Sequence, residues 1–418
     1  MSQTYPIRPV SPADYEALIE VDAHAFLEPW HAQMQLRERT IVEFDRTFAA
    51  RDGDQMVGIG GIHSFRLAVP GGTAPAAGIT RIAVLPSHRR RGILTAMMSH
   101  LFSDASRRSE PLAILFASES GIYGRFGFGL ASMDLDLRIR RGEGRLSSGP
   151  VPAGRPGPVR LRPAEPLAAR AELGHVFETV FARQPGMVAR DERWWTYLLT
   201  DPAALRPAGS SPLRCLLAAD EHGPRGYVLY RTKSGWDSDH LAEGRLEVRE
   251  LYAIDPAATA ALWSDLLSRD LVGEVHGRMR PVDEPLLAML ADPRRARPAL
   301  IDGPWLRLVD LPAAMTARTY SAAADLVIDV TDPVLPGNDG RWRLRAAGPG
   351  SGGTACERTG EPAHVQISVQ ALAAGYLGRA CLSQLAGAGQ VAELTPGALA
   401  MLGTALAWDR PPYSGMMF

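Results

Sequence analysis

Three consecutive arginines and a glycine stand out in this sequence as residues able to bind an anion. The segment LPSHRRRGILTAMM (Leu85–Met98) places Arg89, Arg90, Arg91 and Gly92 directly before an apolar, helix-like pattern. The first amides of a helix have no partner within the helix, and the helix dipole adds about half a positive charge there. Glycine lets a ligand approach the backbone, and arginine donates charge-assisted hydrogen bonds. This combination predicts a site for a phosphate or diphosphate group.

The alternative interpretation is a solvated basic start to a helix. Positive charge is unfavourable at a helix N-terminus, so three arginines there favour an anionic ligand. Apolar residues at 93, 94, 97, 98, 101, 102 and 105 predict a helix with one buried face, and RIAVLP before the loop predicts a strand. PLAILFASE (Pro111–Glu119) predicts a buried strand after the helix. The order of these elements indicates an α/β layer.

The strand before the loop offers a second expected contact. A ligand that joins a diphosphate to an amide-bearing arm, as the pantetheine of coenzyme A does, can pair its amides with a free strand edge. Ile82, Ala83 and Val84 would supply this edge, and Pro86 would end it.

Composition divides the chain into three blocks, with expected domains at residues 1–150, 151–298 and 299–418. The stretch Arg140–Arg160 is rich in Gly, Pro, Ser and Arg, which predicts a linker or a surface crossover. In the second block, RLEVRELYAIDPAATAALWSDLLSRDL repeats the strand–turn–helix plan of the first block without its arginines and glycine. An internal duplication explains this repeat. Independent convergence on a common α/β unit is the alternative.

The third block predicts a smaller α+β layer. DLVIDVTDP, GRWRLRAAG and AHVQISVQALAAGYLG are expected to be strands, followed by TPGALAMLGTALAWDRPPYSGMMF. The Gly-rich stretch AAGPGSGGTACERTG is expected to connect a hairpin within this layer.

Bulk properties argue against several classes of function. The 418 residues carry a formal net charge of −1, so no global field favours nucleic acid or an anionic membrane. Cys215, Cys356 and Cys381 are odd in number and far apart, which does not fit a disulfide framework or a zinc site. The N-terminus lacks a leader pattern, and there is no run of about 18 apolar residues. We therefore expect a cytoplasmic protein with no metal and with no nucleic-acid or membrane partner.

Two motifs resemble a known enzyme superfamily. The pattern V-x-x-x-x-R-R-R-G-I-L resembles the acetyl-CoA loop of the GCN5-related N-acetyltransferases (GNAT), with Arg89 and Gly92 at defined positions and Leu94 where the family often has Gly or Ala. FASESGIYGRFGFGLAS (Phe116–Ser132) is similar to the tyrosine-bearing segment of the enhanced-intracellular-survival (Eis) branch. The resemblance implies an α/β (α+β) fold. Tandem GNAT-like mixed-sheet domains, of which the second is degenerate, would precede a smaller sterol-carrier-like α+β domain.

The resemblance also implies an activity, the transfer of an acetyl group from acetyl-CoA to a primary amine. The expected acceptors are polyamine-like or aminoglycoside-like small molecules, or lysine side chains. By the same resemblance, Tyr123 is the general acid and the C-terminal carboxylate of Phe418 is the general base. That carboxylate is ionised at neutral pH, because its reference pKa is roughly 3.3–3.7. The family commonly forms hexamers, so a homo-oligomer is expected.

The expected ligand contacts follow from these motifs. In the acceptor site near AHAFLEPW, Phe26 and Trp30 are expected to stack on the substrate and Glu28 to attract its positive charge. Core packing is the alternative role for Phe26. A non-catalytic acyl-CoA-binding or lipid-binding protein on the same scaffold is the alternative function, and Tyr123 favours the enzyme. Acetyl-CoA is expected to contact Ile82, Ala83, Val84, Arg89, Arg90, Arg91, Gly92, Ile93, Leu94, Thr95, Ser118 and Glu119.

Overall fold

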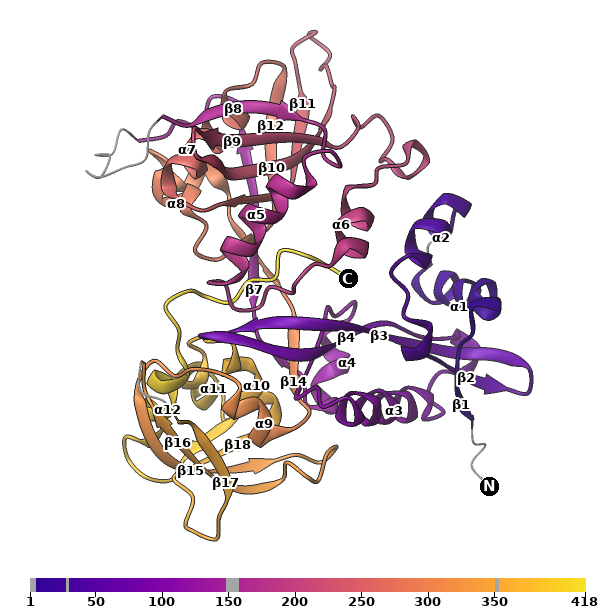
Figure 1. Ribbon diagram of the computed structural model, residues 1–418, viewed down its shortest axis with the longest axis vertical. Coiled ribbons are helices and arrows are strands. Elements are labelled where there is room, and N and C mark those ends of the chain that lie inside the picture. Colours follow the sequence, from indigo (N-terminus) through magenta and orange to yellow (C-terminus); the bar gives the residue numbers. More distant parts are fainter. Residues whose placement is uncertain (1–4, 28–29, 148–157, 350–352) are drawn as a thin grey trace. The chain divides into compact units, whose positions relative to one another are not determined.

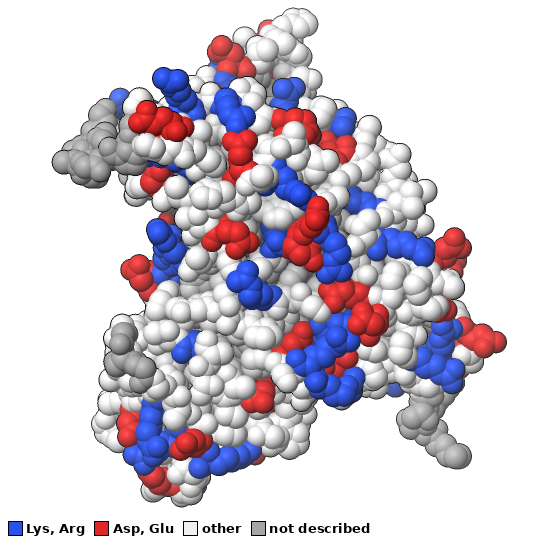
Figure 2. All heavy atoms as spheres, viewed as in Figure 1, with Lys and Arg blue, Asp and Glu red and all other residues white. Residues whose placement is uncertain are grey.

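The structure is a computed structural model that describes residues 5–27, 30–147, 158–349 and 353–418. The chain forms two compact units: Met1–Ser132, Pro185–Ala189 and Pro304–Phe418 make up the first, and Met133–Gln184 and Arg190–Gly303 the second. No helix within the described ranges is long and apolar enough to cross a membrane. Acidic and basic side chains are interspersed over the face shown in Figure 2, in keeping with the near-zero net charge.

A seven-stranded sheet organises the N-terminal part of the first unit. Its strand order is β1-β2-β3-β4-β5-β14-β6, and β4 and β5 are its parallel pair. The strands are Ile7–Pro9 (β1), Thr47–Asp52 (β2), Gln55–Val69 (β3), Gly72–Val84 (β4), Leu112–Leu115 (β5), Gly129–Leu130 (β6) and Trp305–Leu308 (β14). The helices are Tyr15–Phe26 (α1), Ala32–Arg39 (α2), Ile93–Arg107 (α3) and Ser120–Tyr123 (α4).

Helix α3 packs along β3 and β4 (Figure 1). Its buried side chains include Ile93, Met97, Leu101 and Phe102, which lie at positions that the apolar period predicted. Gly92 precedes the helix with a φ of 81°, a left-handed conformation that glycine adopts without strain. The predicted strand–loop–helix unit is therefore confirmed.

Strands β4 and β5 diverge and so expose an edge of β4. They pair only between Ala76–Gly78 and Leu112–Ile114, whereas β4 continues to Val84. Beyond Gly78, the side of β4 that faces β5 has no strand partner among the described strands. The register on the β3 side shifts in the same stretch, where Arg81 has a φ of 54°. This bulge redirects the strand before it enters the arginine loop.

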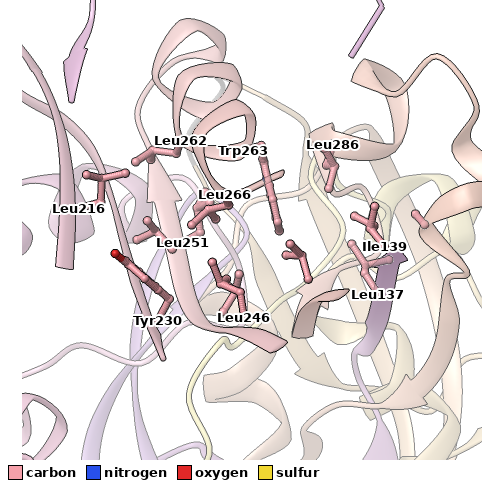
Figure 3. Packing of buried hydrophobic residues seen from close by; sticks show 14 of the residues in the cluster. Leu137, Ile139, Leu216, Tyr230, Leu246, Leu251, Leu262, Trp263, Leu266 and Leu286 are labelled. Carbon is pink, nitrogen blue, oxygen red and sulfur yellow. The ribbon is translucent and has the colours of Figure 1, made fainter. Parts of the chain in front are cut away.

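The second unit contains a sheet of its own, in the order β13-β7-β12-β11-β10-β9-β8. Helix α7 packs against it, and Figure 3 shows Leu262, Trp263 and Leu266 of this helix among the sheet side chains Leu246 and Leu251. The strands are Met133–Arg140 (β7), Arg160–Ala164 (β8), Arg214–Asp220 (β9), Gly223–Lys233 (β10), Gly244–Ala253 (β11), Val272–Pro281 (β12) and Ala299–Asp302 (β13). The helices are Arg170–Phe181 (α5), Glu192–Leu199 (α6), Pro256–Ser268 (α7) and Pro285–Met289 (α8).

The second unit repeats the strand–helix–parallel strand plan of the first with a different helix start. β11 and β12 pair in parallel around α7, as β4 and β5 do around α3. At the start of α7, however, the carboxylate of Asp255 accepts hydrogen bonds from the amides of Ala257 and Ala258. An acidic cap therefore occupies the place that a phosphate would need.

Two strands lie in a different sheet from their neighbours in sequence. β7 pairs with β12 and β13 in the second sheet, and β14 completes the first sheet between β5 and β6. These pairings connect residues more than 100 positions apart. The domain limits expected at residues 150 and 298 stay predictions.

The C-terminal part of the first unit is a five-stranded sheet, in the order β17-β16-β15-β18-β19, with helices. The Gly-rich stretch lies between β16 and β17, which pair antiparallel as expected of a hairpin, although its residues 350–352 lie outside the described ranges. The strands are Ala323–Thr331 (β15), Gly340–Ala347 (β16), Ala355–Arg358 (β17), Val365–Ser368 (β18) and Val391–Glu393 (β19). The helices are Leu311–Thr316 (α9), Val369–Tyr376 (α10), Leu382–Gly387 (α11) and Ala398–Leu406 (α12).

The expectation of one strand across AHVQISVQALAAGYLG was wrong in its second half. The strand ends at Ser368, whose side chain accepts a hydrogen bond from the amide of Ala371 and caps helix α10. Seven of the eight residues in α10 are buried, so the helix has no polar face that would reveal its period in the sequence.

Helix α10 packs against β6 through a glycine. A Cβ atom on Gly129 would lie 2.5 Å from the backbone nitrogen of Ala374 and still closer to the carbonyl oxygen of Gln370. We expect Gly129→Ala to lower the free energy of unfolding by about 1–3 kcal/mol, because backbone atoms of the helix cannot move aside as a flexible side chain can. Urea unfolding measures the change. Gly403→Ala is the matched control, since that helical glycine has open space around it. Equal stability of the two variants would contradict this account of the packing.

Candidate functional site

A pocket of about 650 Å³ lies where the edge of β4, the arginine loop, the start of α3 and helix α4 converge. All of these elements belong to the first unit. Eleven of the twelve residues expected to contact acetyl-CoA line this pocket, and Arg91 is the exception. The lining residues are Ala25, Phe26, Leu27, Ile82, Ala83, Val84, His88, Arg89, Arg90, Gly92, Ile93, Leu94, Thr95, Ser118, Glu119, Ile122, Tyr123 and Arg125.

Positive charge in the pocket comes from three arginines. Arg89, Arg90 and Arg125 are exposed, and none of them forms an ion pair or a hydrogen bond through its side chain with another described residue. Arg125 lies over the ring of Phe126, with its guanidinium carbon 5.0 Å from the ring centre. Three cations on the wall of one pocket, without acidic partners in the described part of the chain, fit an anionic ligand, because such a ligand would supply the balancing negative charge.

The backbone of the loop is strained in the same place. Arg90 has a φ of 63°, a left-handed conformation that residues other than glycine seldom adopt. Strain of this kind clusters at ligand-binding sites, where the surrounding structure enforces it. Together with the left-handed Gly92, it turns the chain sharply enough to start α3 directly beside the pocket.

Contacts with Asp52 and Tyr5, which do not line the pocket, hold the loop in this shape. The Nε2 atom of His88 lies 3.3 Å from a carboxylate oxygen of Asp52, and the His88 ring contacts the edge of Tyr5. Arg91 donates a hydrogen bond of 3.0 Å to the Tyr5 hydroxyl, which takes its side chain away from the other arginines. The structure thus gives Arg91 a contact within the protein and leaves Arg89 and Arg90 at the pocket.

Tyr123 is the last residue of α4 and is buried in the pocket wall. Its ring contacts Phe128 edge to face, and its hydroxyl forms no hydrogen bond with any other described residue. Burial, together with the negative charge of Glu119, raises the pKa of Tyr123 to about 12. The phenol therefore stays protonated at neutral pH and has a proton available for a group in the pocket.

Phe418 reaches β3 and the end of β5, although its ring does not line the pocket. Its ring centre lies 4.8 Å from that of Phe65 and 5.5 Å from that of Phe116. The His63 ring lies 6.4 Å away, nearly perpendicular to it. Phe116 lies between β5 and α4, the helix that ends at Tyr123. The C-terminal residue therefore contacts the same short segment that carries the tyrosine.

The three expected acceptor residues have different surroundings. Phe26 ends α1, is 40% exposed and lines the pocket, which does not fit a purely core role. Trp30 does not line it, because its Nε1 donates a hydrogen bond to Asp22 and Arg81 lies over its ring. Glu28 lies outside the described residues.

Sequence reasoning did not select five lining residues: Ala25, Leu27, His88, Ile122 and Arg125. Arg125 carried a signal, since a cation two residues after Tyr123 on a short helix has to stay near it. His88 also belonged to the basic run before Gly92. Ala25, Leu27 and Ile122 had no chemical signal and enter the pocket only through packing.

The described part of the chain contains no cluster of metal-binding side chains. No group of three or more His, Cys, Asp or Glu residues there is arranged to hold a metal ion. Cys215, Cys356 and Cys381 are buried, and none of them forms a disulfide with another described residue.

We expect loss of the pocket arginines to weaken the binding of coenzyme A. Replacing Arg89 and Arg90 together with glutamine should raise the Kd about tenfold or more, because charge-assisted hydrogen bonds contribute about 1.5–3 kcal/mol each. Titration calorimetry at two salt concentrations measures the effect and its ionic part. Arg91→Gln is the matched control, since Arg91 contacts Tyr5. An equal rise in the Kd for Arg91→Gln would contradict this assignment. It would show that the total charge of the loop sets the affinity, whichever arginines line the pocket.

Comparisons with known proteins agree with this architecture. Residues 6–131 and 186–308 match two families, both described as acetyltransferase (GNAT) domain, and residues 311–415 match the sterol carrier protein domain. An uncharacterized N-acetyltransferase of Streptomyces avermitilis is 44% identical over 366 residues, which is 86% of each chain. The N-acetyltransferase Eis of Mycobacterium tuberculosis is 34% identical over 389 residues, or 91% of each chain.

Solved structures give the same result. The crystal structure of Eis1 from Mycobacterium abscessus matches with a TM-score of 0.82 and 31% identity, covering 99% of this chain and 100% of that one. A GCN5-related N-acetyltransferase from Anabaena variabilis has the same TM-score at 18% identity, and at that identity the match shows the shared fold alone.

Proposed function

This chain belongs to the Eis family of GNAT N-acetyltransferases, and on that premise we propose that it transfers an acetyl group from acetyl-CoA directly to primary amines of polyamine-like or aminoglycoside-like acceptors, or of lysine side chains. Enzymes with GNAT domains use acetyl-CoA as the acyl donor. The observation that carries the proposal is the buried phenol of Tyr123 in a pocket whose wall also carries three arginines with no ion pair to any described residue.

The proposed donor site consists of the β4 edge and the arginine loop. The amides and carbonyls of Ile82, Ala83 and Val84 would pair with the pantetheine arm, as in the addition of a strand. The start of α3, with Gly92, Arg89 and Arg90, would hold the diphosphate. Ile93, Leu94, Thr95, Ser118 and Glu119 would complete the walls, and Arg91 would support the loop through Tyr5. When bound, the thioester supplies an activated acyl carbon.

Tyr123 is proposed as the general acid. As the new C–N bond forms and the C–S bond breaks, negative charge develops on sulfur. A phenol with a pKa of about 12 stays protonated throughout the working range, donates a hydrogen bond to that sulfur and can pass its proton to it. The absence of a protein partner for its hydroxyl among the described residues supports this role.

The C-terminal carboxylate of Phe418 is proposed as the general base. A primary amine is mostly protonated at neutral pH, and the proton that it loses on acylation needs an acceptor. In this proposal the amine proton goes to the Phe418 carboxylate, while sulfur receives its proton from Tyr123. The contacts of the Phe418 ring with Phe65 and Phe116 support a fixed position for this terminus.

The acceptor is proposed to enter beside Phe26 and Glu28. Phe26 supplies an exposed aromatic face at the pocket, and Glu28 would attract the amine. Trp30, through its bond to Asp22, would support this wall from outside the pocket. A cytoplasmic homo-hexamer with domains at 1–150, 151–298 and 299–418 completes the proposal, and light scattering of the purified protein tests the hexamer.

A turnover screen tests the proposal. Acetyl-CoA is offered with aminoglycosides, polyamines and lysine-containing peptides, and released thiol is measured. We expect thiol release that depends on at least one class of amine and that disappears without acceptor. Tight binding of coenzyme A without amine-dependent release from any class would overturn the proposed substrates.

A further inference from the structure

The short segment Pro185–Ala189 joins β3 to the C-terminal tail. Its backbone extends the ladder of β3, since Ala68 donates to the Met187 carbonyl and accepts from the Gly186 amide, each at 2.8 Å. Ala189 donates to the carbonyl of Arg66 at 2.9 Å. On the tail side, the amide of Tyr413 donates to the carbonyl of Pro185 at 2.8 Å. The segment therefore bonds to both neighbours through backbone atoms.

The tail itself is fixed along most of its length. Arg318 is buried and donates to the Leu406 carbonyl at the end of α12, where the tail begins. The buried hydroxyl of Ser132 donates to the carbonyl of Pro412 at 2.7 Å. Tyr413, Ser414 and Met416 are also buried. Buried backbone of this kind keeps its hydrogen bonds, so the path of the tail is set before Phe418 is reached.

Gly186 lies directly against the backbone of the tail. Its φ is 94°, and a Cβ atom there would lie 3.0 Å from both the backbone nitrogen and the carbonyl oxygen of Tyr413. Any side chain would therefore push against backbone atoms of the tail and would also strain its own backbone. A side chain at residue 186 would therefore disturb the 2.8 Å hydrogen bond between Pro185 and Tyr413.

We infer that Pro185–Ala189 is a clamp that positions the Phe418 carboxylate for the reaction, with Gly186 as its positioning residue. This inference rests on the proposed role of that carboxylate as the base. The clamp bonds to β3 at Arg66–Ala68, and Phe65 of the same strand contacts the Phe418 ring. It bonds to the tail at Tyr413, five residues before Phe418. The same short segment thus bonds both to the tail and to β3, the strand whose Phe65 contacts the Phe418 ring.

In the sequence, the clamp lies between two parts of the second unit, one that ends at Gln184 and one that begins at Arg190. The clamp itself belongs to the first unit, whereas the residues directly before and after it belong to the second.

Gly186→Ala tests the inference in the full-length enzyme. Carboxypeptidase A, which removes C-terminal aromatic residues, reports the freedom of Phe418 without reference to catalysis. We expect faster release of Phe418 in Gly186→Ala than in the unchanged protein. We also expect a kcat about 100-fold lower, because small misplacements of catalytic groups have effects of that size, with the Kd for acetyl-CoA unchanged.

Gly389→Ala is the matched control, since Gly389 also has a positive φ (75°) but has open space around it. It should keep both the resistance to carboxypeptidase and the kcat. Ser132→Ala provides a second, milder variant if Gly186→Ala does not fold, because it removes the hydroxyl that bonds to the Pro412 carbonyl and leaves Gly186 in place. It should change release and kcat in the same directions.

The outcomes separate the clamp from the base. Unchanged release of Phe418 in both Gly186→Ala and Ser132→Ala would overturn the clamp and leave the proposed base untouched. Faster release with an unchanged kcat would overturn the base and, with it, the catalytic part of the inference. Faster release with a lower kcat and an unchanged Kd for acetyl-CoA supports both.

Discussion

Replacing Tyr123 with phenylalanine is expected to lower kcat about 100- to 10,000-fold, the range that a positioned general acid contributes. The substitution removes one oxygen from a buried ring that keeps its contact with Phe128. Because the hydroxyl has no hydrogen-bond partner among the described residues, its loss leaves no protein group unsatisfied. Stability and the Kd for acetyl-CoA should therefore stay close to those of the unchanged enzyme. Steady-state kinetics and titration calorimetry measure these quantities.

Tyr15→Phe is the control for this experiment. Tyr15 is likewise buried, burial raises its pKa to about 12, and its hydroxyl donates to the carbonyl of Gln35. Its loss should reduce stability by about 1 kcal/mol and leave kcat nearly unchanged. If Tyr123→Phe kept normal turnover, another group would have to protonate the leaving thiolate.

The raised pKa of Tyr123 also predicts how kcat depends on pH. The acidic form of the phenol persists up to about pH 12, so its deprotonation should not reduce kcat anywhere between pH 6 and pH 10. A fall in kcat on the alkaline side of that range, if it vanished in Tyr123→Phe, would contradict this assignment.

Adding two glycines after Phe418 is expected to lower kcat about 100-fold or more while the Kd for acetyl-CoA stays unchanged. The extension converts the carboxylate into a neutral amide and moves the terminal charge two residues away. The Phe418 ring can still contact Phe65 and Phe116, so the tail should remain in place. Turnover with released thiol as the readout measures the loss.

The same two residues added at the N-terminus are the control, and Phe418→Ala separates charge from packing. Phe418→Ala keeps a terminal carboxylate but loses the ring contacts, so its kcat should lie between those of the unchanged and the extended enzyme. An extended enzyme with normal turnover would exclude the terminal carboxylate as the base.

Local features of the sequence predicted the core of the site. The apolar period from Ile93, the glycine before it and the arginines of the loop depend on helix geometry within a few residues, and the structure has them as expected. Tyr123 likewise lies in a short segment, Phe116–Ser132, where it ends the helix α4 that follows β5. Neighbours in sequence are neighbours in space, so residue type and spacing suffice there.

Contacts between distant segments could not be predicted in this way. Arg89, Arg90 and Arg91 are indistinguishable in sequence, and only Tyr5, 86 residues away, decides that Arg91 leaves the pocket. Trp30 has the residue type of an acceptor wall, and its hydrogen bond to Asp22 gives it a different place. Helix α10 was missed because burial on every side removes the period that reveals a helix.

The sequence by itself determined the arginine loop, the helix that follows it and the tyrosine of α4, because each depends on backbone geometry within a few residues. Tertiary structure alone decided which arginines face the pocket, that β7 and β14 pair in sheets away from their sequence neighbours, and that Phe418 meets Phe65 and Phe116. Side-chain packing and the hydrogen bonds of strand edges join residues hundreds of positions apart, and no local pattern encodes which partner they will find.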